Sequence, residues 1–310
     1  MREYILSSTP PLQSKKRSLT QDEVAGIGFG MLAFFIWGFT PFYWRSLADL
    51  GAVEIIAHRV VWCAIFMSFI LTVTGQWKEV VTTISTPIIT LILFLSASLV
   101  SLNWGMFVYS VVTDQLVASS LGYFLSPLVS VFLGFIFLTE RPTVKQWVAV
   151  LLATAAVITQ FIAYGSLPWI ALTIAFSFGL YGLIRKTVKA GSNVGLFIEC
   201  LVMAPFGLGF LFWLESNGTG SFGNHDISLD LLIVLAGVIT GVPLMLFAAS
   251  ARRIRLTTIG LFQYFTPSTY LIIAIWLFNE KFTVNEWISF CLLWLGLIIY
   301  TSEIWRTRQV

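Results

Sequence analysis

Ten long apolar runs occupy most of this sequence of 310 residues, and they restrict its fold more than any other feature. About 18 or more apolar residues with few charges are enough to cross the hydrocarbon core of a bilayer as a helix. The connections between the runs are short, apart from the polar stretch Glu215 to Asp226. The runs cover residues 25–44, 53–74, 88–110, 116–138, 144–162, 166–184, 194–214, 229–249, 257–278 and 284–303.

The fold class follows from the solvent in which such runs lie. Inside hydrocarbon every backbone N–H and C=O must be paired within the protein, so only helices and closed barrels span a membrane. A barrel gives weak, alternating segments of about 10 residues rather than long continuous apolar runs. Charged residues make up only 11% of the chain, against roughly 25% in an ordinary soluble domain. We therefore expect an all-α integral membrane protein with ten transmembrane helices.

Lys and Arg are distributed unevenly between alternate connections. If the N-terminus is cytoplasmic, the outer loops hold only Arg45 and Lys281, and Arg59 lies inside the second run. The positive-inside rule then predicts that both termini are cytoplasmic, and it explains the basic clusters as determinants of topology. We accordingly expect no nucleic-acid partner. The cations on the inner side are Arg2, Lys15, Lys16, Arg17, Lys78, Arg141, Lys145, Arg185, Lys186, Lys189, Arg252, Arg253, Arg255, Arg306 and Arg308.

The sequence contains an internal repeat with an offset of 140 residues. The offset places VASSLGYFLSPLVSVFLGFIFLTERPTVKQW on TTIGLFQYFTPSTYLIIAIWLFNEKFTVNEW, and it pairs Pro127 with Pro267 and Glu140 with Glu280. Five helices per copy is an odd number, so the second copy would be inverted in the membrane relative to the first. The expected division is a cytoplasmic tail at 1–24, a first repeat at 25–162, a second repeat at 163–305 and a cytoplasmic tail at 306–310.

Inverted repeats are typical of secondary transporters, whose substrate site lies near the midplane where the two halves meet. The two copies resemble EamA domains of the drug/metabolite transporter superfamily across nearly all of residues 25–305. The stretches EIIAHRVVW, SLGYFLSPLVSVFLGFIFLTER, AFSFGLYGLIRK and IGLFQYFTPS are similar to those of RarD-type permeases, the "chloramphenicol-sensitive" proteins of bacterial inner membranes. The resemblance implies a ten-helix permease of the bacterial inner (cytoplasmic) membrane. Relatives carry amino acids, other small metabolites or drugs.

Three ionisable side chains interrupt the second run within EIIAHRVVW. A charge at the centre of a transmembrane helix costs about 2.5 to 3.5 kcal/mol, so such a residue is by default a candidate site. Glu54, His58 and Trp62 share one helix face, with Arg59 one residue round. In a functional interpretation Arg59 and His58 line a cavity, Arg59 binds a substrate carboxylate, and Trp62 forms an aromatic wall. In a structural interpretation Arg59 snorkels outward, and Glu54 with His58 belongs to an interhelical network.

Glu199 is the only acid within the seventh run, and the 140-residue offset pairs it with Arg59. Because the copies are inverted, the two residues would give the cavity a basic outer pole and an acidic inner pole, which suits a zwitterion. A direct Arg59 to Glu199 salt bridge that holds the halves together is the alternative. Glu54, His58 and Glu199 are also candidates for proton coupling, and facilitated diffusion or exchange is equally compatible with the sequence.

The EamA resemblance implies that helices 3, 4, 8 and 9 pack at the centre, and these supply further candidates for substrate contact. Amide side chains there can orient the polar end of an amino acid, and rings beside them can hold its side chain. The chain has 12 Trp, 9 Tyr and 27 Phe, so a place in the core or in the interfacial belt is the alternative for each ring. The candidates are Asn103, Trp104, Tyr109, Tyr123, Gln263 and Tyr264.

Prolines and acids mark the fourth and ninth runs. Pro127 and Pro267 interrupt the helical hydrogen bonds in mid-run, either as hinges for alternating access or as fixed kinks. Glu140 and Glu280 resemble the family's helix-end acid, and each is expected to cap a helix or to pair with the cation that follows it. Helix-end and kink roles outside the site are assigned to Pro168, Tyr181, Arg185 and Lys186.

Several chemical motifs are absent from the sequence. It has no phosphate-binding Gly loop, no HExxH and no GxSxG, and its three cysteines stand singly without metal-ligand spacing. We therefore expect a secondary transporter without metal or other cofactor, able to act as a monomer on a small amphipathic substrate such as an aromatic or neutral amino acid or a drug like chloramphenicol. The alternative is an intramembrane enzyme or sensor built on Glu54, His58 and Arg59, against which the repeat argues.

Overall fold

The computed structural model describes residues 20–47, 49–112, 116–164, 169–224, 226–266, 268–269, 272 and 284–309. Throughout those residues the regular structure is helical, without a strand, as the apolar runs predict. The long helices are α1 (Gln21–Arg45), α2 (Ala52–Thr74), α4 (Pro87–Val112), α5 (Leu116–Phe137), α6 (Val144–Tyr164), α7 (Trp169–Thr187), α8 (Ser192–Ser216), α9 (Ile227–Arg253) and α12 (Val284–Gln309).

Two helices differ from the expected pattern. The short α3 (Trp77–Ile84), which the sequence did not suggest, lies between α2 and α4 and buries Val80 and Thr83. Only the start of the ninth run is described as a helix of its own, α10 (Leu256–Phe262). Five helices of the described part are long and apolar enough to cross a membrane, namely α1, α2, α4, α8 and α9, and three shorter apolar stretches lie in α5, α6 and α12.

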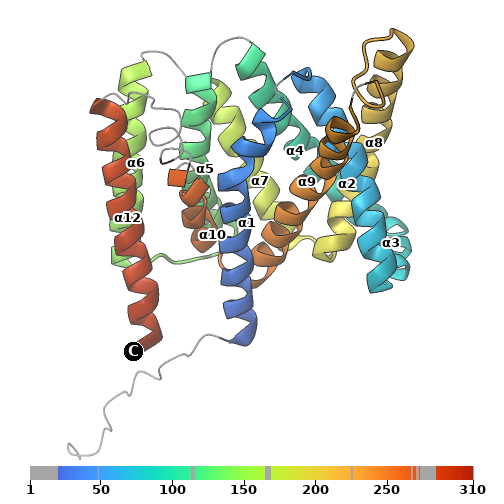
Figure 1. The fold of residues 1–310 in the computed structure, drawn as a ribbon. Coiled ribbons are helices and arrows are strands. Elements are labelled where there is room, and N and C mark those ends of the chain that lie inside the picture. Colours follow the sequence, from blue (N-terminus) through green and yellow to red (C-terminus); the bar gives the residue numbers. More distant parts are fainter. Residues whose placement is uncertain are drawn as a thin grey trace, which may run out of the picture.

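The helices stand side by side as a bundle, with α6 and α12 at one edge and α2, α3 and α8 at the other (Figure 1). The start of α1 and the end of α12 lie at the same end of the bundle (Figure 1). Helices related by the 140-residue offset pack against each other, because α2 contacts α8, α5 contacts α10, and α6 contacts α12. The same offset relates α1 to α7 and α4 to α9. Accordingly, α1 packs against α9 and α7 packs against α4.

Glycines allow α2 to pack closely against α8 and α9. A Cβ at Gly237 of α9 would lie 2.4 Å from the carbonyl group of Trp62, and a Cβ at Gly207 of α8 would lie 3.2 Å from the Ala57 carbonyl oxygen. Small residues at helix interfaces are how membrane helices gain van der Waals contact. The polar residues of α2 are therefore held between helices that belong to the second half of the chain.

Candidate functional site

Arg59 lies at the meeting point of four helices. Its guanidinium carbon is 4.5 Å from the ring centroid of Trp44 on α1 and 4.5 Å from that of Trp104 on α4. Its Nε donates a hydrogen bond of 3.0 Å to Oγ1 of Thr240 on α9. Since α4 packs on α7 and α8 while α9 packs on α1 and α2, Arg59 connects the two sets of helices. We call Arg59, Trp44, Trp104 and Thr240 the arginine box.

The contacts of the arginine box direct Arg59 toward α1, α4 and α9, and its side chain is half-buried. A cation–π contact contributes about 0.5 to 1 kcal/mol at an exposed site and about 2 kcal/mol when the cation is desolvated, so two rings offset part of the cost of placing the charge there. The sequence singled out Arg59 and Trp104 of this group. Trp44 and Thr240 were missed, because Trp44 stands at a helix end where belt aromatics are common and a lone Thr in an apolar helix carries no pattern.

The other polar residues of α2 face a different neighbour, the connection between α8 and α9. The carboxylate of Glu54 accepts hydrogen bonds from the backbone N–H of Ser221, at 2.8 Å, and from its hydroxyl, at 3.2 Å. Nε2 of His58 is 3.8 Å from Oε1 of Glu54, so the contact expected from their spacing is present. The ring of Phe222 lies 5.7 Å from that of His58 and 5.5 Å from that of Trp62.

Glu199 forms a third group with residues of α4 and α7. It accepts a hydrogen bond of 2.6 Å from the Ser96 hydroxyl and one of 3.3 Å from the Tyr181 hydroxyl. Nη1 of Arg185 is 3.5 Å from its Oε1, and all four residues are completely or almost completely buried. Among the described residues, the ion pair of Glu199 is thus with Arg185 and not with Arg59. Tyr181 and Arg185, to which the sequence assigned kink and helix-end roles, are its partners.

The packing around Arg185 is specific. Nη2 donates to the carbonyl oxygen of Ser192 at 2.9 Å, which ties the charge to the turn between α7 and α8. A Cβ at Gly195 would overlap Nη1 of Arg185, so a larger residue there would require this buried guanidinium to move. We call Ser96, Tyr181, Arg185 and Glu199 the buried charge centre.

An aromatic cluster lies between the arginine box and the buried charge centre. The ring of Phe247 on α9 is 5.9 Å from that of Trp37 on α1, 5.2 Å from that of Phe178 on α7, and 5.8 Å from that of Tyr181, with which it is stacked at 16°. Phe247 is seven residues beyond Thr240 on α9, about 10 Å along the helix. The rings therefore fill the space between α1, α7 and α9 about two turns from Arg59, and Tyr181 belongs to both groups.

The remaining candidates contact other helix pairs. The amide of Asn103 donates to the Ile174 carbonyl oxygen at 2.9 Å and thereby joins α4 to α7. Gln263 donates to the Ser130 hydroxyl at 3.2 Å, and the hydroxyl of Tyr264 donates to the Phe124 carbonyl oxygen at 3.4 Å, so both join the α10 region to α5. Rings of neighbouring residues pack on the last two candidates, Tyr109 against Trp169 and Tyr123 against Phe107.

Glu140 caps a helix, in line with one of its two expected roles, and the helix is α10. Its carboxylate accepts hydrogen bonds from the backbone N–H groups of Leu256, at 2.8 Å, and Thr257, at 3.0 Å, and from the Thr257 hydroxyl. Pro127 lies inside the continuous helix α5, and a Cβ at Gly260 of α10 would lie 2.8 Å from its carbonyl oxygen. Glu280, Pro168 and Pro267 lie outside the described residues.

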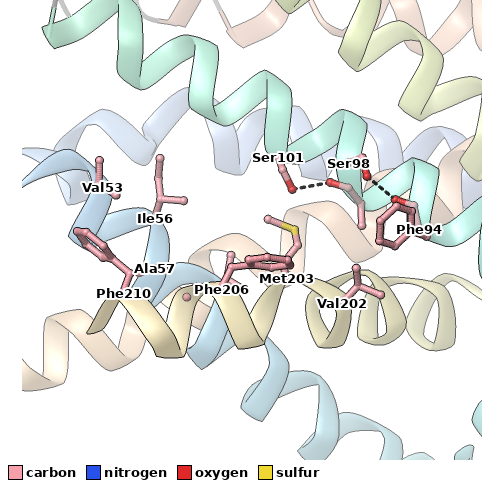
Figure 2. Close-up of a pocket in the computed structure, with 13 residues that line it drawn as sticks. Val53, Ile56, Ala57, Phe94, Ser98, Ser101, Val202, Met203, Phe206 and Phe210 are labelled. Atoms are coloured by element: carbon pink, nitrogen blue, oxygen red, sulfur yellow. Dashed lines mark hydrogen bonds between the residues drawn. The ribbon is translucent and has the colours of Figure 1, made fainter. Parts of the chain in front are cut away.

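A groove of about 500 Å³ lies between α2, α4 and α8. Its walls are almost wholly apolar, and Figure 2 shows the side chains of Phe94, Met203, Phe206 and Phe210 along it. The groove lies next to the arginine box, because Ile56 is one helical turn from Arg59 on α2 and Ser101 is one turn from Trp104 on α4. The polar groups of the box are not among the residues that line the groove. The described residues contain no cluster of three or more His, Cys, Asp or Glu that could hold a metal ion.

This arrangement is that of a membrane-embedded helical protein with a charged interior, and comparison with known proteins identifies its class. The model of the EamA-like transporter family matches residues 24–161 and again residues 167–302. The chain therefore belongs to the EamA-like transporter family and is a multi-pass membrane protein.

Curated relatives carry the identification further. Protein RarD of Escherichia coli (strain K12) is 38% identical over 284 residues, which cover 92% of this chain and 96% of that protein. An uncharacterized transporter of Bacillus subtilis (strain 168), YojE, is 38% identical over 89% of this chain and 93% of its own. The chain is thus a permease of the RarD type. A solved crystal structure with 13% identity covers 89% of this chain at a TM-score of 0.70, a likeness of fold alone.

Proposed function

We propose that this permease is a secondary transporter that moves a small amphipathic metabolite across the bacterial inner membrane by alternating access. A substrate such as an aromatic or neutral amino acid would carry an anionic group and an apolar or aromatic part. The other candidate, a drug such as chloramphenicol, is uncharged and would meet Arg59 only through neutral hydrogen-bond acceptors. The observation that carries the proposal is the arginine box, where a cation held between two indole rings joins α2 to α1, α4 and α9.

Alternating access needs two comparable halves, and we propose ten spans in two inverted repeats with both termini in the cytoplasm. The proposal is supported by the family model, which matches the chain twice. It is also supported by three pairs of helices that are related by the offset of 140 residues and pack on each other, namely α2 with α8, α5 with α10 and α6 with α12. A single chain with two halves is sufficient for this mechanism, so we propose a monomer.

In the proposed mechanism Arg59 binds the anionic group of the substrate. The hydrogen bond from its Nε to Thr240 fixes the plane of the guanidinium, and a fixed planar fork suits a carboxylate better than a flexible ammonium group. Because Arg59 covers one face of each indole ring, the edges and opposite faces of Trp44 and Trp104 would contact the rest of the substrate. On the side toward the start of α1, the aromatic cluster of Trp37, Phe178 and Phe247 closes the path, and its rings would separate when that side opens.

The buried charge centre is the proposed coupling element. Tyr181 donates to Glu199 and stacks on Phe247, so a change of charge at Glu199 would act directly on the aromatic cluster. Glu54 and His58 are the other proposed coupling residues, because they contact the connection that leads into α9. Asn103, Tyr123, Gln263 and Tyr264 join helices that would move against each other, and Pro127 and Pro267 are the proposed hinges.

Counterflow in proteoliposomes tests the proposal. Purified protein is reconstituted with an excess of unlabelled amino acids inside and trace labelled tryptophan or phenylalanine outside, with and without a pH gradient. Transient accumulation of label is expected, and a response to the gradient would support coupling at Glu199, Glu54 or His58. Accumulation no greater than that of empty liposomes would remove aromatic amino acids as substrates, and the same result with chloramphenicol and a wider metabolite set would contradict the proposed transport.

A further inference from the structure

The groove between α2, α4 and α8 has the composition of a site for a hydrocarbon chain. Its lining carries no charged group, and its two hydroxyl donors are already used within α4. Ser98 donates to the Phe94 carbonyl oxygen at 2.9 Å, and Ser101 donates to the Ala97 carbonyl oxygen at 2.6 Å (Figure 2). A buried water needs about two to four polar partners, which these walls do not offer. The occupant must therefore be apolar.

The shape of the groove is elongated. Val53, Ile56 and Phe210 lie at one end, and Phe94 and Val202 lie at the other (Figure 2). Val53 is next to the first residue of α2, so the groove starts near the end of the bundle where α2 begins and α8 finishes. It continues from there toward the middle of the three helices. A flexible chain that enters from one leaflet fits this course.

The groove is continuous with the surface that faces lipid. Phe206 of α8 is 78% exposed and Phe94 of α4 is 52% exposed, and both lie on helices long and apolar enough to span the membrane. The groove, with a volume of about 500 Å³, is open on one side, and if nothing filled it these side chains would lack partner atoms and lose dispersion energy. In the hydrocarbon layer the molecules at hand to fill it are lipid acyl chains.

We propose that the groove is a binding site for one acyl chain of a bilayer phospholipid, in the leaflet at the end where α2 begins. The chain lies against Ile56, Phe94, Met203 and Phe210. Since α2 and α4 come from the first half of the sequence and α8 from the second, the bound chain fills the seam between the halves. The groove begins one helical turn from Arg59 and Trp104, but its lining is apolar, and the proposal does not require that the protein transports any particular substrate.

Photocrosslinking tests the proposal. The full-length protein is reconstituted in liposomes that contain a phospholipid with a diazirine in mid-chain, irradiated, and mapped by peptide mass spectrometry. We expect adducts to concentrate on the groove segments of α2, α4 and α8, well above those on the exposed apolar residues of α6 and α12. Ser101→Trp fills the groove and should abolish this excess, whereas Leu102→Trp, on the neighbouring lipid-facing position, should retain it.

Three results would overturn the proposal. The first is adducts that follow exposure alone, with α6 and α12 labelled as strongly as the groove, as ordinary annular lipid would produce. The second is a Ser101→Trp variant that folds, elutes as the wild type does on size exclusion and still keeps the excess. The third is removal of the adducts by excess chloramphenicol or tryptophan, which would assign the groove to substrate. If Ser101→Trp does not fold, the smaller Ser98→Phe at the same groove replaces it with the same expected loss.

Discussion

Replacing Arg185 by methionine removes the positive charge from the buried charge centre and leaves Glu199 in place. Arg185 is completely buried and Glu199 nearly so, with 3.5 Å between Nη1 and Oε1. Breaking a buried ion pair by removing one partner costs about 3 to 5 kcal/mol, because the other charge is left uncompensated. We expect Arg185→Met and Glu199→Gln each to lower the free energy of unfolding by about this amount. The double variant should lose clearly less than the sum of the two.

The assay is equilibrium unfolding of the purified protein in mixed micelles with a rising fraction of dodecyl sulfate. A double-mutant cycle isolates the pair term, which we expect to be about 2 to 3 kcal/mol for Arg185 and Glu199. The matched control is the pair Arg253 and Asp22, which has a shorter distance of 2.9 Å but side chains that are 32% and 69% exposed. Exposed pairs contribute about 1 kcal/mol or less. Additive losses at Arg185 and Glu199 would show that the two side chains do not stabilise each other, and equal coupling in both cycles would show that burial does not strengthen the pair.

Three further outcomes follow from single contacts. Gly237→Val should prevent α2 from packing on α9, since a Cβ there meets the Trp62 carbonyl group at 2.4 Å, and should abolish the monodisperse size-exclusion peak. Gly209→Val, with nothing within 4 Å of its added Cβ, should leave the peak intact. Glu140→Ala should lower stability by about 1 to 3 kcal/mol, as it leaves the buried donors of Leu256 and Thr257 unpaired; an unchanged unfolding midpoint would contradict the cap. Tyr181→Phe keeps the stacked ring but removes the hydrogen bond to Glu199, so it should shift the pH dependence of counterflow without loss of folded protein. An unchanged pH profile would show that Tyr181 takes no part in proton coupling.

The apolar runs were sufficient to predict the helical fold. Every run except the ninth, of which only the start is described as a separate helix, corresponds to one long helix, because length and hydropathy decide which segments enter a bilayer. The short helix α3 was missed, since eight residues with charges at Lys78 and Glu79 give no apolar run. The offset of 140 residues also indicated which helices are counterparts, and several of those counterparts pack together.

Site residues were harder to predict, because one-dimensional spacing does not say which neighbour a helix face meets. Arg59 and Glu54 lie five residues apart on different faces of α2. Arg59 contacts Trp104 on α4, whereas Glu54 contacts Ser221 in the connection between α8 and α9, and the sequence names neither neighbour. Arg185 stands beside Lys186 at a helix end, where the positive-inside rule already explains a cation. One clue was available, since Tyr181 and Arg185 lie four residues apart on one face of α7.

Arg59 is the proposed substrate-binding residue, and counterflow by the Arg59→Ala variant decides whether it has this role. The variant is compared with Arg141→Ala, which removes an arginine whose guanidinium carbon lies 5.0 Å from the ring centroid of Phe135, far along the sequence from the arginine box. Both variants should insert and purify as the wild type does. We expect Arg59→Ala to abolish accumulation of the labelled substrate and Arg141→Ala to retain it. Full accumulation by Arg59→Ala would show that Arg59 does not bind the substrate.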